Sequence, residues 1–362
     1  MKLNDQGVCV VGAQPPPVQG MAMVNKYFAD ALKDKANYLL IVDLSPRSLS
    51  RSRLVRLRRI SRVLGGLIRV LANIRNWHTM YVGLSGGAGQ LYETLFIFLA
   101  RCFGKKLFLH HHSFAYLDSR KTVTRITTLA AGSATHIVLC EKMRCLLQAN
   151  YASVKKIHVL SNAAFIAAHS PIPTPKTSLN TIGYLSNISE EKGIFQFLGV
   201  MEKLSALGLQ VRGLIAGPFQ NLEIENAVMM RLKALDNVQY VGPKYGGEKD
   251  AFFAHIDVLL FPTRYVNEAE PLTLYEAMAA ATPIIPWDRG CISHMLPNNS
   301  VVVPRDGDFI DNAVNKLLQW KENEAELNAI SLENLNSFNQ RKQRSQTGYE
   351  QVLDWVCHAG RS

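Results

Sequence analysis

The sequence predicts an α/β protein made of two parallel-sheet halves. Short apolar runs alternate with helix-period segments along the chain, a pattern typical of parallel sheets with crossover helices. The length of 362 residues fits two domains at roughly 100–200 residues each. One proline-rich segment, residues 167–180, is the clear linker. The predicted domains are therefore residues 1–166 and 181–339.

The elements of the first half follow from its buried apolar runs. Helices are expected at residues 21–32 and 91–103, and a basic helical segment within residues 47–78. Strands are expected at residues 8–11, 38–44, 80–84, 106–109, 136–139 and 156–160.

The alternation restarts beyond the linker. A helix opens at Pro271 and continues to about residue 281, and a last helix covers residues 340–357. Two such halves are expected to hold a ligand in the cleft between them. Strands are expected at residues 180–185, 211–216, 238–241, 258–261, 283–286 and 300–303.

The positive charge of the chain is concentrated in one segment. Residues 47–78 contain nine arginines and no lysine, aspartate or glutamate, so they supply nine of the eleven net positive charges. This pattern indicates a local anionic partner and argues against a general affinity for nucleic acid.

The basic segment has the spacing of an amphipathic helix, which suits an anionic membrane surface. An alternative is that its apolar stripe packs on the sheet while the arginines are solvated. The two interpretations are compatible if the stripe packs on the sheet while the arginines face lipid headgroups. The stripe comprises Leu57, Ile60, Leu64, Leu67, Ile68, Leu71 and Ile74. The arginines roughly opposite it are Arg51, Arg58, Arg59, Arg62 and Arg69.

No membrane span or leader is expected. One of the longest apolar runs, residues 95–100, is far below the roughly 20 residues that a spanning helix needs. The first residues have no apolar stretch long enough for a signal peptide. The sequence therefore predicts a cytoplasmic protein, peripheral on the inner face of the membrane.

The most informative stretch is residues 261–290. Glu268 follows a buried strand, and Glu276 lies on the helix after it, with seven residues between them. Carboxylates near a helix start can accept hydrogen bonds from sugar hydroxyls. The spacing therefore favours a site for a polyhydroxylated ligand.

This stretch resembles the signature of the group 1 glycosyltransferases (glycosyltransferase family 4). Glu268, Glu276-Ala277-Met278-Ala279 and then Pro283-Ile284-Ile285 follow the family pattern, although Ala281 stands where a glycine usually ends the helix. The resemblance implies the GT-B fold, two Rossmann-like domains facing each other across a cleft. It also implies a retaining mechanism and a final helix, residues 340–362, that packs back on the first domain.

The resemblance also implies roles for these residues. Glu268 would contact the donor sugar and Glu276 the ribose. The residues that open the intervening helix, Pro271, Leu272 and Thr273, are expected in the donor site.

A phosphate site is expected after the first strand of the second half. Ser186, Asn187 and Lys192 lie between that strand and a helix start, where backbone N–H groups and a lysine suit a diphosphate. By resemblance Lys192 holds the donor diphosphate, but Tyr184 replaces the usual arginine. Arg264 is the candidate for the missing positive charge.

The first half supplies two further candidate positions. Gly20 follows a proline-rich loop that resembles the family loop near the donor phosphate; the alternative is a simple connection. Strand alternation puts His110 and His112 on one side and His111 on the other. We expect His112, and second His110, to face the sugar or acceptor. Hydrogen-bonded strand-end histidines are the alternative; a two-histidine metal site lacks an evident third ligand.

The combined expectation is a metal-independent hexosyltransferase that needs no cofactor. It would move a sugar from a nucleotide diphosphate sugar to a lipid-linked or other saccharide acceptor in bacterial surface polysaccharide biosynthesis. Glu268, His112 and Lys192 are the predicted catalytic residues. The alternatives are an epimerase or phosphorylase of the same fold, and a non-enzymatic protein that binds membrane or nucleic acid.

Overall fold

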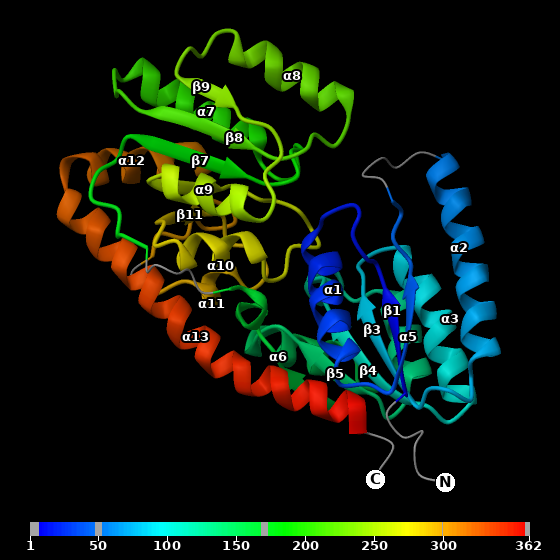
Figure 1. The fold of residues 1–362 in the computed structure, drawn as a ribbon. Coiled ribbons are helices and arrows are strands. Elements are labelled where there is room, and N and C mark those ends of the chain that lie inside the picture. The colour runs from blue at the N-terminus through cyan, green and yellow to red at the C-terminus, as the bar shows by residue number, and fades with distance from the viewer. Residues whose placement is uncertain (1–6, 48–52, 168–172, 299, 359–362) are drawn as a thin grey trace. The chain divides into compact units, whose positions relative to one another are not determined.

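The computed structural model describes residues 7–47, 53–167, 173–298 and 300–358 (Figure 1). The chain divides into two compact units. The first contains residues 1–165 and 344–362, and the second contains residues 166–343.

The first unit is built on a six-stranded parallel sheet with the order β2-β1-β3-β4-β5-β6. Strands β1 and β3 are buried along their whole length, as expected for parallel strands covered on both faces. The strands are β1 (Gly7–Gly12), β2 (Tyr38–Asp43), β3 (Thr79–Leu84), β4 (Lys106–His111), β5 (Thr135–Val138) and β6 (Lys156–Val159).

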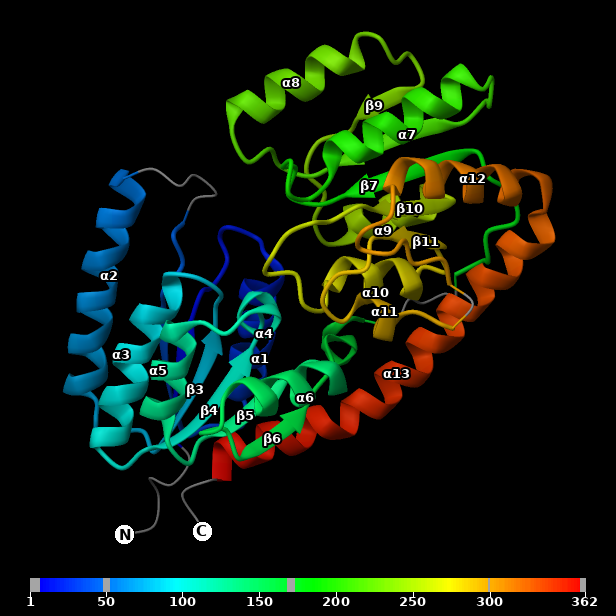
Figure 2. The same cartoon turned by 180° about the vertical axis from the view of Figure 1, so that it is seen from behind.

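Helices cover both faces of this sheet (Figures 1 and 2). One face is covered by α2 (Arg53–Ala72), α3 (Gly89–Cys102) and α5 (Thr122–Ala131), which share a core with the strands. On the other face, α1 (Gly20–Lys33) packs with the end of the last helix. The unit also contains α4 (Ala115–Asp118), α6 (Glu141–Asn150) and a short 3-10 helix, Asn162–Phe165.

The second unit holds a five-stranded parallel sheet with the order β11-β10-β7-β8-β9. The chain runs outward from β7 to β9 and returns to the other side of β7 with β10, so the direction of winding reverses between β7 and β10. Open α/β sheets bind ligands beyond the strand ends at such a point. The strands are β7 (Thr181–Leu185), β8 (Arg212–Ala216), β9 (Val238–Tyr240), β10 (Val258–Phe261) and β11 (Ile284–Pro286).

The helices of the second unit enclose a large apolar core in which Trp287 and Trp320 are buried. They are α7 (Ile194–Ala206), α8 (Leu222–Leu232), α9 (Gly247–His255), α10 (Leu272–Ala279), α11 (Ile292–Met295) and α12 (Phe309–Glu322). The strand predicted at residues 300–303 is wrong, because the only ladder contact described for it is a single bridge between Val303 and Trp287.

The last helix, α13 (Glu324–His358), is much longer than the sequence suggested. It begins at Glu324 and not near residue 340, because no proline or glycine interrupts residues 324–347. Leu327 and Ile330 pack in the core of the second unit. Val352 and Val356 pack in the core of the first.

The apolar stripe of α2 is divided, so the alternative that it packs on the sheet holds only in part: Leu67 and Ile74 pack against the core of the first unit. Val63, Gly66 and Val70 are buried, whereas the stripe residues Ile60, Leu64, Ile68 and Leu71 are 43–67% exposed. The helix lies so close to β2 at Gly66 that a Cβ there would be 2.7 Å from Val42, so glycine is suited to this inward-facing position. Among the described residues, no helix is long and apolar enough to cross a membrane.

The arginines of α2 are also placed differently from the prediction. The Arg59 guanidinium lies 5.1 Å from the centre of the Tyr92 ring, and Arg62 Nη1 donates to the Ser45 carbonyl at 2.8 Å. These two arginines therefore contact protein, while Arg69 is exposed. Arg51 lies outside the described residues, and so does the side chain of Arg58.

Candidate functional site

The candidate site lies on the two loops that follow β7 and β10, the strands at the reversal point. The loop after β7 ends at Gly193, immediately before α7. Gly193 has a φ of +83°, and a Cβ there would lie 2.0 Å from the carbonyl oxygen of Pro262. Glycine thus allows the first loop to pack directly against the second.

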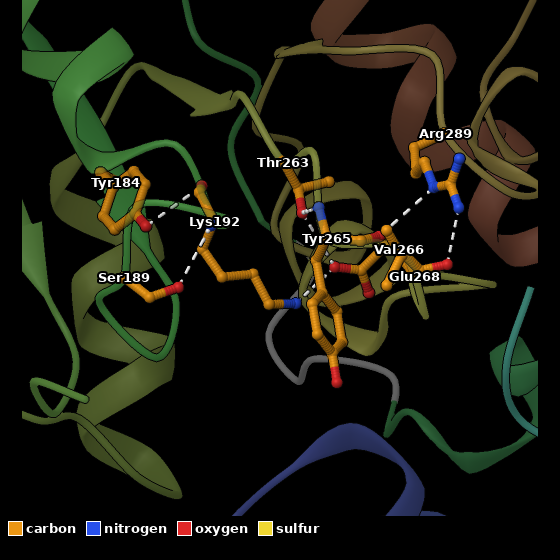
Figure 3. A network of polar contacts seen from close by, with 8 residues as sticks. All are labelled: Tyr184, Ser189, Lys192, Thr263, Tyr265, Val266, Glu268 and Arg289. Carbon is orange, nitrogen blue, oxygen red and sulfur yellow. Dashed lines mark hydrogen bonds and ion pairs between the residues drawn. The ribbon is translucent and has the colours of Figure 1, made fainter. Parts of the chain in front are cut away.

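An ion pair joins the two loops. The ammonium group of Lys192 contacts Oε2 of Glu268 (Figure 3). Thr263 Oγ1 donates to the same carboxylate oxygen at 3.2 Å, and Glu268 is buried. The Lys192 Nζ also lies 4.6 Å from the centre of the Tyr265 ring. The pair is held in a partly desolvated place, where charge interactions are stronger than in water.

The backbone of Lys192 is fixed as well. Its N–H donates to Ser189 Oγ at 3.2 Å, and its carbonyl accepts from the Tyr184 hydroxyl at 3.2 Å. A backbone held at both groups limits the positions that the ammonium can reach. The site therefore presents a positioned cation beside a positioned carboxylate, which suits a ligand with both phosphate and hydroxyl groups.

A buried arginine braces the loop that carries Glu268. Arg289 follows β11 and donates to the carbonyls of Tyr265 at 3.3 Å and Val266 at 2.6 Å. The next residue, Gly290, has a φ of +62°, and a Cβ there would lie 2.4 Å from the Glu268 carbonyl oxygen. Arg289 was not predicted from the sequence, because one arginine in a loop has no spacing pattern.

Helix α10 positions the second glutamate. Pro271 precedes this helix, and Leu272 and Thr273 are its first two residues, whose N–H groups have no acceptor within the helix. Glu276 is half-buried and forms an ion pair with Lys249 of α9. Lys249 was not predicted either, since no motif in the sequence includes it.

The end of α10 explains the usual glycine at this place in the family pattern. Ala281 has a φ of +53°, in the left-handed region that favours glycine. The turn is closed by the N–H of Thr282, which donates to the Ala277 carbonyl at 2.9 Å. Ala281 therefore replaces the glycine of the family pattern but keeps the left-handed backbone that glycine would adopt.

The remaining residues expected near phosphate have different environments. Tyr184 is a core residue whose ring packs 5.6 Å from that of Phe197, and burial raises its pKa well above its usual range. Tyr184 is therefore neutral at the place where the family pattern has a positively charged arginine. The guanidinium of Arg264 lies 3.8 Å from the centre of the Trp287 ring. Ser186 and Asn187 are half-buried on the loop after β7.

In the first unit, the predicted alternation of the histidines is confirmed. The rings of His110 and His112 lie 4.1 Å apart. His110 Nδ1 is 2.6 Å from the Tyr81 hydroxyl. On the opposite side of the strand, His111 Nε2 lies 2.9 Å from His136 Nδ1. Burial lowers the pKa of His112 to about 3, so its ring is neutral at physiological pH.

Gly20 is the first residue of α1 and is exposed, and a Cβ there would have no atom within 4 Å. Within the described part of the chain, no group of three or more histidine, cysteine or acidic residues could hold a metal ion.

The candidates fall into two sets. The first unit carries Gly20, His110 and His112. The second unit carries the others and joins Lys192 directly to Glu268. The residues expected in the donor site that lie on the second unit are Ser186, Asn187, Lys192, Arg264, Glu268, Pro271, Leu272, Thr273 and Glu276.

Comparison with known proteins gives one family and several related folds. Residues 166–334 match the family described as Glycosyl transferases group 1. Anabaena HepE in complex with UDP and glucose has a TM-score of 0.70 at 13% identity over 96% of this chain and 99% of that one. Sucrose-phosphate synthase from Thermosynechococcus elongatus has a TM-score of 0.71 at 13% identity, with the same coverage.

A third similar structure is the pneumococcal O-GlcNAc transferase GtfA in complex with UDP and GlcNAc. Its TM-score is 0.63 at 16% identity, covering 81% of this chain and 60% of that one. At such identities these likenesses show the fold. Comparison with curated proteins gave no match.

The two parallel sheets and the family match define a nucleotide-sugar glycosyltransferase with the GT-B fold. Residues 166–334 carry the match to the group 1 glycosyl transferases, the family that the sequence resembles. The matched segment contains Lys192, Glu268 and Glu276, so the predicted family is confirmed.

Proposed function

We propose that the protein is a retaining, metal-independent hexosyltransferase acting on a lipid-linked saccharide. The proposal rests on the Lys192–Glu268 ion pair at the reversal point of the sheet. Lys192 lies on the loop expected to bind the diphosphate, and Glu268 is the carboxylate expected to bind the sugar. A nucleotide diphosphate sugar needs both groups, a cation for the diphosphate and an acceptor for the sugar hydroxyls.

The donor is a UDP-sugar in this proposal. The structure of HepE has been determined with UDP-glucose, and UDP is bound in the GtfA structure. Specificity can differ between proteins of one fold, so the donor is to be measured against GDP- and ADP-sugars.

The proposed reaction proceeds on one face of the sugar. The bond from the anomeric carbon to the diphosphate breaks, and the acceptor oxygen bonds to the same face, while its proton passes to a phosphate oxygen. Lys192 and the N-terminus of α7 stabilise the charge on the leaving diphosphate. Glu268 orients the sugar, and Glu276 accepts from the ribose.

His112 contributes as a neutral group in this proposal. Because burial lowers its pKa to about 3, the ring carries one N–H donor and one acceptor at neutral pH. We propose that it binds a sugar or acceptor hydroxyl, with His110 behind it. Gly20 leaves room for a donor phosphate to approach the start of α1.

The proposed acceptor is a lipid-linked saccharide used in bacterial surface polysaccharide assembly, reached from the inner face of the cytoplasmic membrane. The concentration of arginine in residues 47–78 supports an anionic membrane as a partner. No nucleic acid takes part.

The test is release of nucleoside diphosphate from UDP-, GDP- and ADP-sugars in EDTA, with and without a bacterial membrane lipid extract. We expect release from one donor that depends on the extract and is lost in Glu268→Gln. Release that requires a divalent metal would contradict the metal-independent mechanism. Release without any acceptor, with isomerised sugar as product, would indicate an epimerase.

A further inference from the structure

Three neighbouring helices of the first unit expose an unusual number of large apolar side chains. They lie on the sides of α2, α3 and α5 that face away from the sheet, and each is 43–67% exposed. We call this set the outer apolar face. Its members are Ile60, Leu64, Ile68, Leu71, Leu91, Leu95, Phe98, Ile126 and Leu129.

The spacing on each helix makes these residues continuous stripes. On α3, Leu91, Leu95 and Phe98 follow steps of four and three residues, which place them on one side of the helix. The stripe on α2 has the same kind of spacing. Single exposed leucines are ordinary, but a continuous exposed apolar surface marks a site of interaction.

The three helices lie side by side in both views (Figures 1 and 2). Arg59 of α2 covers the Tyr92 ring of α3. Thr94 of α3 is hydrogen-bonded to Thr127 of α5 at 2.7 Å. The stripes are therefore parts of one surface.

Almost all charged residues of the three helices are basic. The sequences of α2, α3 and α5 contain eight arginines and one acidic residue, Glu93, which is buried. The exposed basic residues on or next to the three helices include Arg69, Arg75, Arg101, Arg120, Lys121 and Arg125.

We propose that the outer apolar face embeds in the interfacial layer of an anionic lipid bilayer. Its leucine, isoleucine and phenylalanine side chains would reach below the headgroups, while the surrounding arginine and lysine groups bind the phosphates. A lipid surface fits better than a protein partner, because anionic headgroups are mobile and can meet scattered cations around an extended apolar surface.

The sequence left open whether the stripe or the arginines opposite it meet the lipid. In this proposal the stripe itself is the contact, and Arg59 and Arg62 stay against the protein. Salt screens charge interactions but not apolar burial. Binding should therefore be weakened, and not abolished, at high ionic strength.

The chain offers a matched pair of thiols to test insertion. Cys102 and Cys145 are both free and exposed. Cys102 continues the α3 stripe one turn beyond Phe98, whereas Cys145 lies on α6, which exposes no large apolar side chain among its described residues. The full chain is labelled at one thiol, with the other replaced by serine, using an environment-sensitive dye.

We expect vesicles of equal parts phosphatidylglycerol and phosphatidylcholine to shift the Cys102 dye to the blue and leave the Cys145 dye unchanged. An equal response of both dyes, or no response at Cys102, would overturn the proposal. Pure phosphatidylcholine vesicles should give a much smaller shift at Cys102.

Cosedimentation with the same vesicles tests the side chains themselves. The triple variant Leu64→Ser, Ile68→Ser and Phe98→Ser should reduce partitioning by at least about tenfold, because three apolar side chains are removed from the contact. The control Leu222→Ser and Met230→Ser removes apolar groups of α8 that are even more exposed, and it should leave partitioning unchanged.

Two outcomes would overturn the proposal: undiminished binding of the triple variant, or a wild-type protein that stays in solution with anionic vesicles. A protein contact would be indicated if the wild type is instead a dimer that the triple variant makes monomeric. Binding of nucleotide sugar by the triple variant should equal that of the wild type, so this test is separate from that of the transferase.

Discussion

At the scale of single residues, Lys192 and Glu268 depend on each other. Removing the cation in Lys192→Met leaves a buried carboxylate without its partner, which should lower the free energy of unfolding by about 2 kcal/mol. The double variant with Glu268→Gln should recover part of that loss, because Gln carries no charge. Urea unfolding of the two single variants and the double variant measures this coupling. Strictly additive losses would show that the pair is not formed.

Glu93 should make the stability of the first unit depend on pH. Burial raises its pKa from 4.5 to about 7. Between these values the folded protein keeps the proton that the unfolded chain has lost, so stability falls as pH rises toward 7 and stays low above it.

Glu93→Gln removes this dependence and keeps an oxygen that can accept from the Ser85 N–H. At pH 8 the variant should exceed the wild type in unfolding free energy by up to about 3 kcal/mol, the equivalent of the pKa shift. Near pH 4.5 the two should be similar. Parallel curves of unfolding free energy against pH would contradict the assignment.

The sequence identified some site residues and missed others for a physical reason. Glu268 and Glu276 have a fixed spacing because both belong to one loop and helix. Arg289 and Lys249 act from other elements, and their contacts with Tyr265 and Glu276 exist only once the sheet has formed. Tertiary partners of this kind leave no local pattern.

At the scale of elements, the close packing of two loops requires Gly193. In Gly193→Ala the new Cβ would meet the Pro262 carbonyl in a left-handed backbone, so the unfolding free energy should fall by more than about 2 kcal/mol. Gly208→Ala is the control, since its φ is +75° but no atom lies within 4 Å. Thermal unfolding compares them. Equal losses in the two variants would mean that backbone strain, and not the loop contact, decides the effect.

Helix α2 shows which part of the fold the sequence could predict. Its helical period was evident, and the alternation of strands and helices correctly predicted both parallel sheets. The sequence left open which side faces the sheet, because the inward contact is made by Val63, Gly66 and Val70, with Leu67 and Ile74 of the stripe beside them. Close approach to Val42 favours small residues there, and hydrophobicity alone does not encode that distance.

At the scale of the whole molecule, the donor residues of the second unit should respond to ligand together. Hydrogen–deuterium exchange with UDP-glucose should protect residues 185–193 and 262–276, because ligand binding stabilises the segments that it contacts. Helix α2, on the outer face of the first unit, should exchange as in the free protein. Protection that is confined to the first unit would contradict the donor assignment.

We propose that the Lys192–Glu268 pair binds the nucleotide sugar. Calorimetric titration, in EDTA, with the nucleotide sugar that the wild type turns over measures this binding. The wild type and the control Glu326→Gln, which alters a similar ion pair with Lys316, should bind equally. Glu268→Gln should bind the free nucleoside diphosphate normally but the nucleotide sugar at least about tenfold more weakly, since a charged hydrogen bond to the sugar is lost. Equal affinity of Glu268→Gln and the wild type for the nucleotide sugar would show that Glu268 does not bind the sugar.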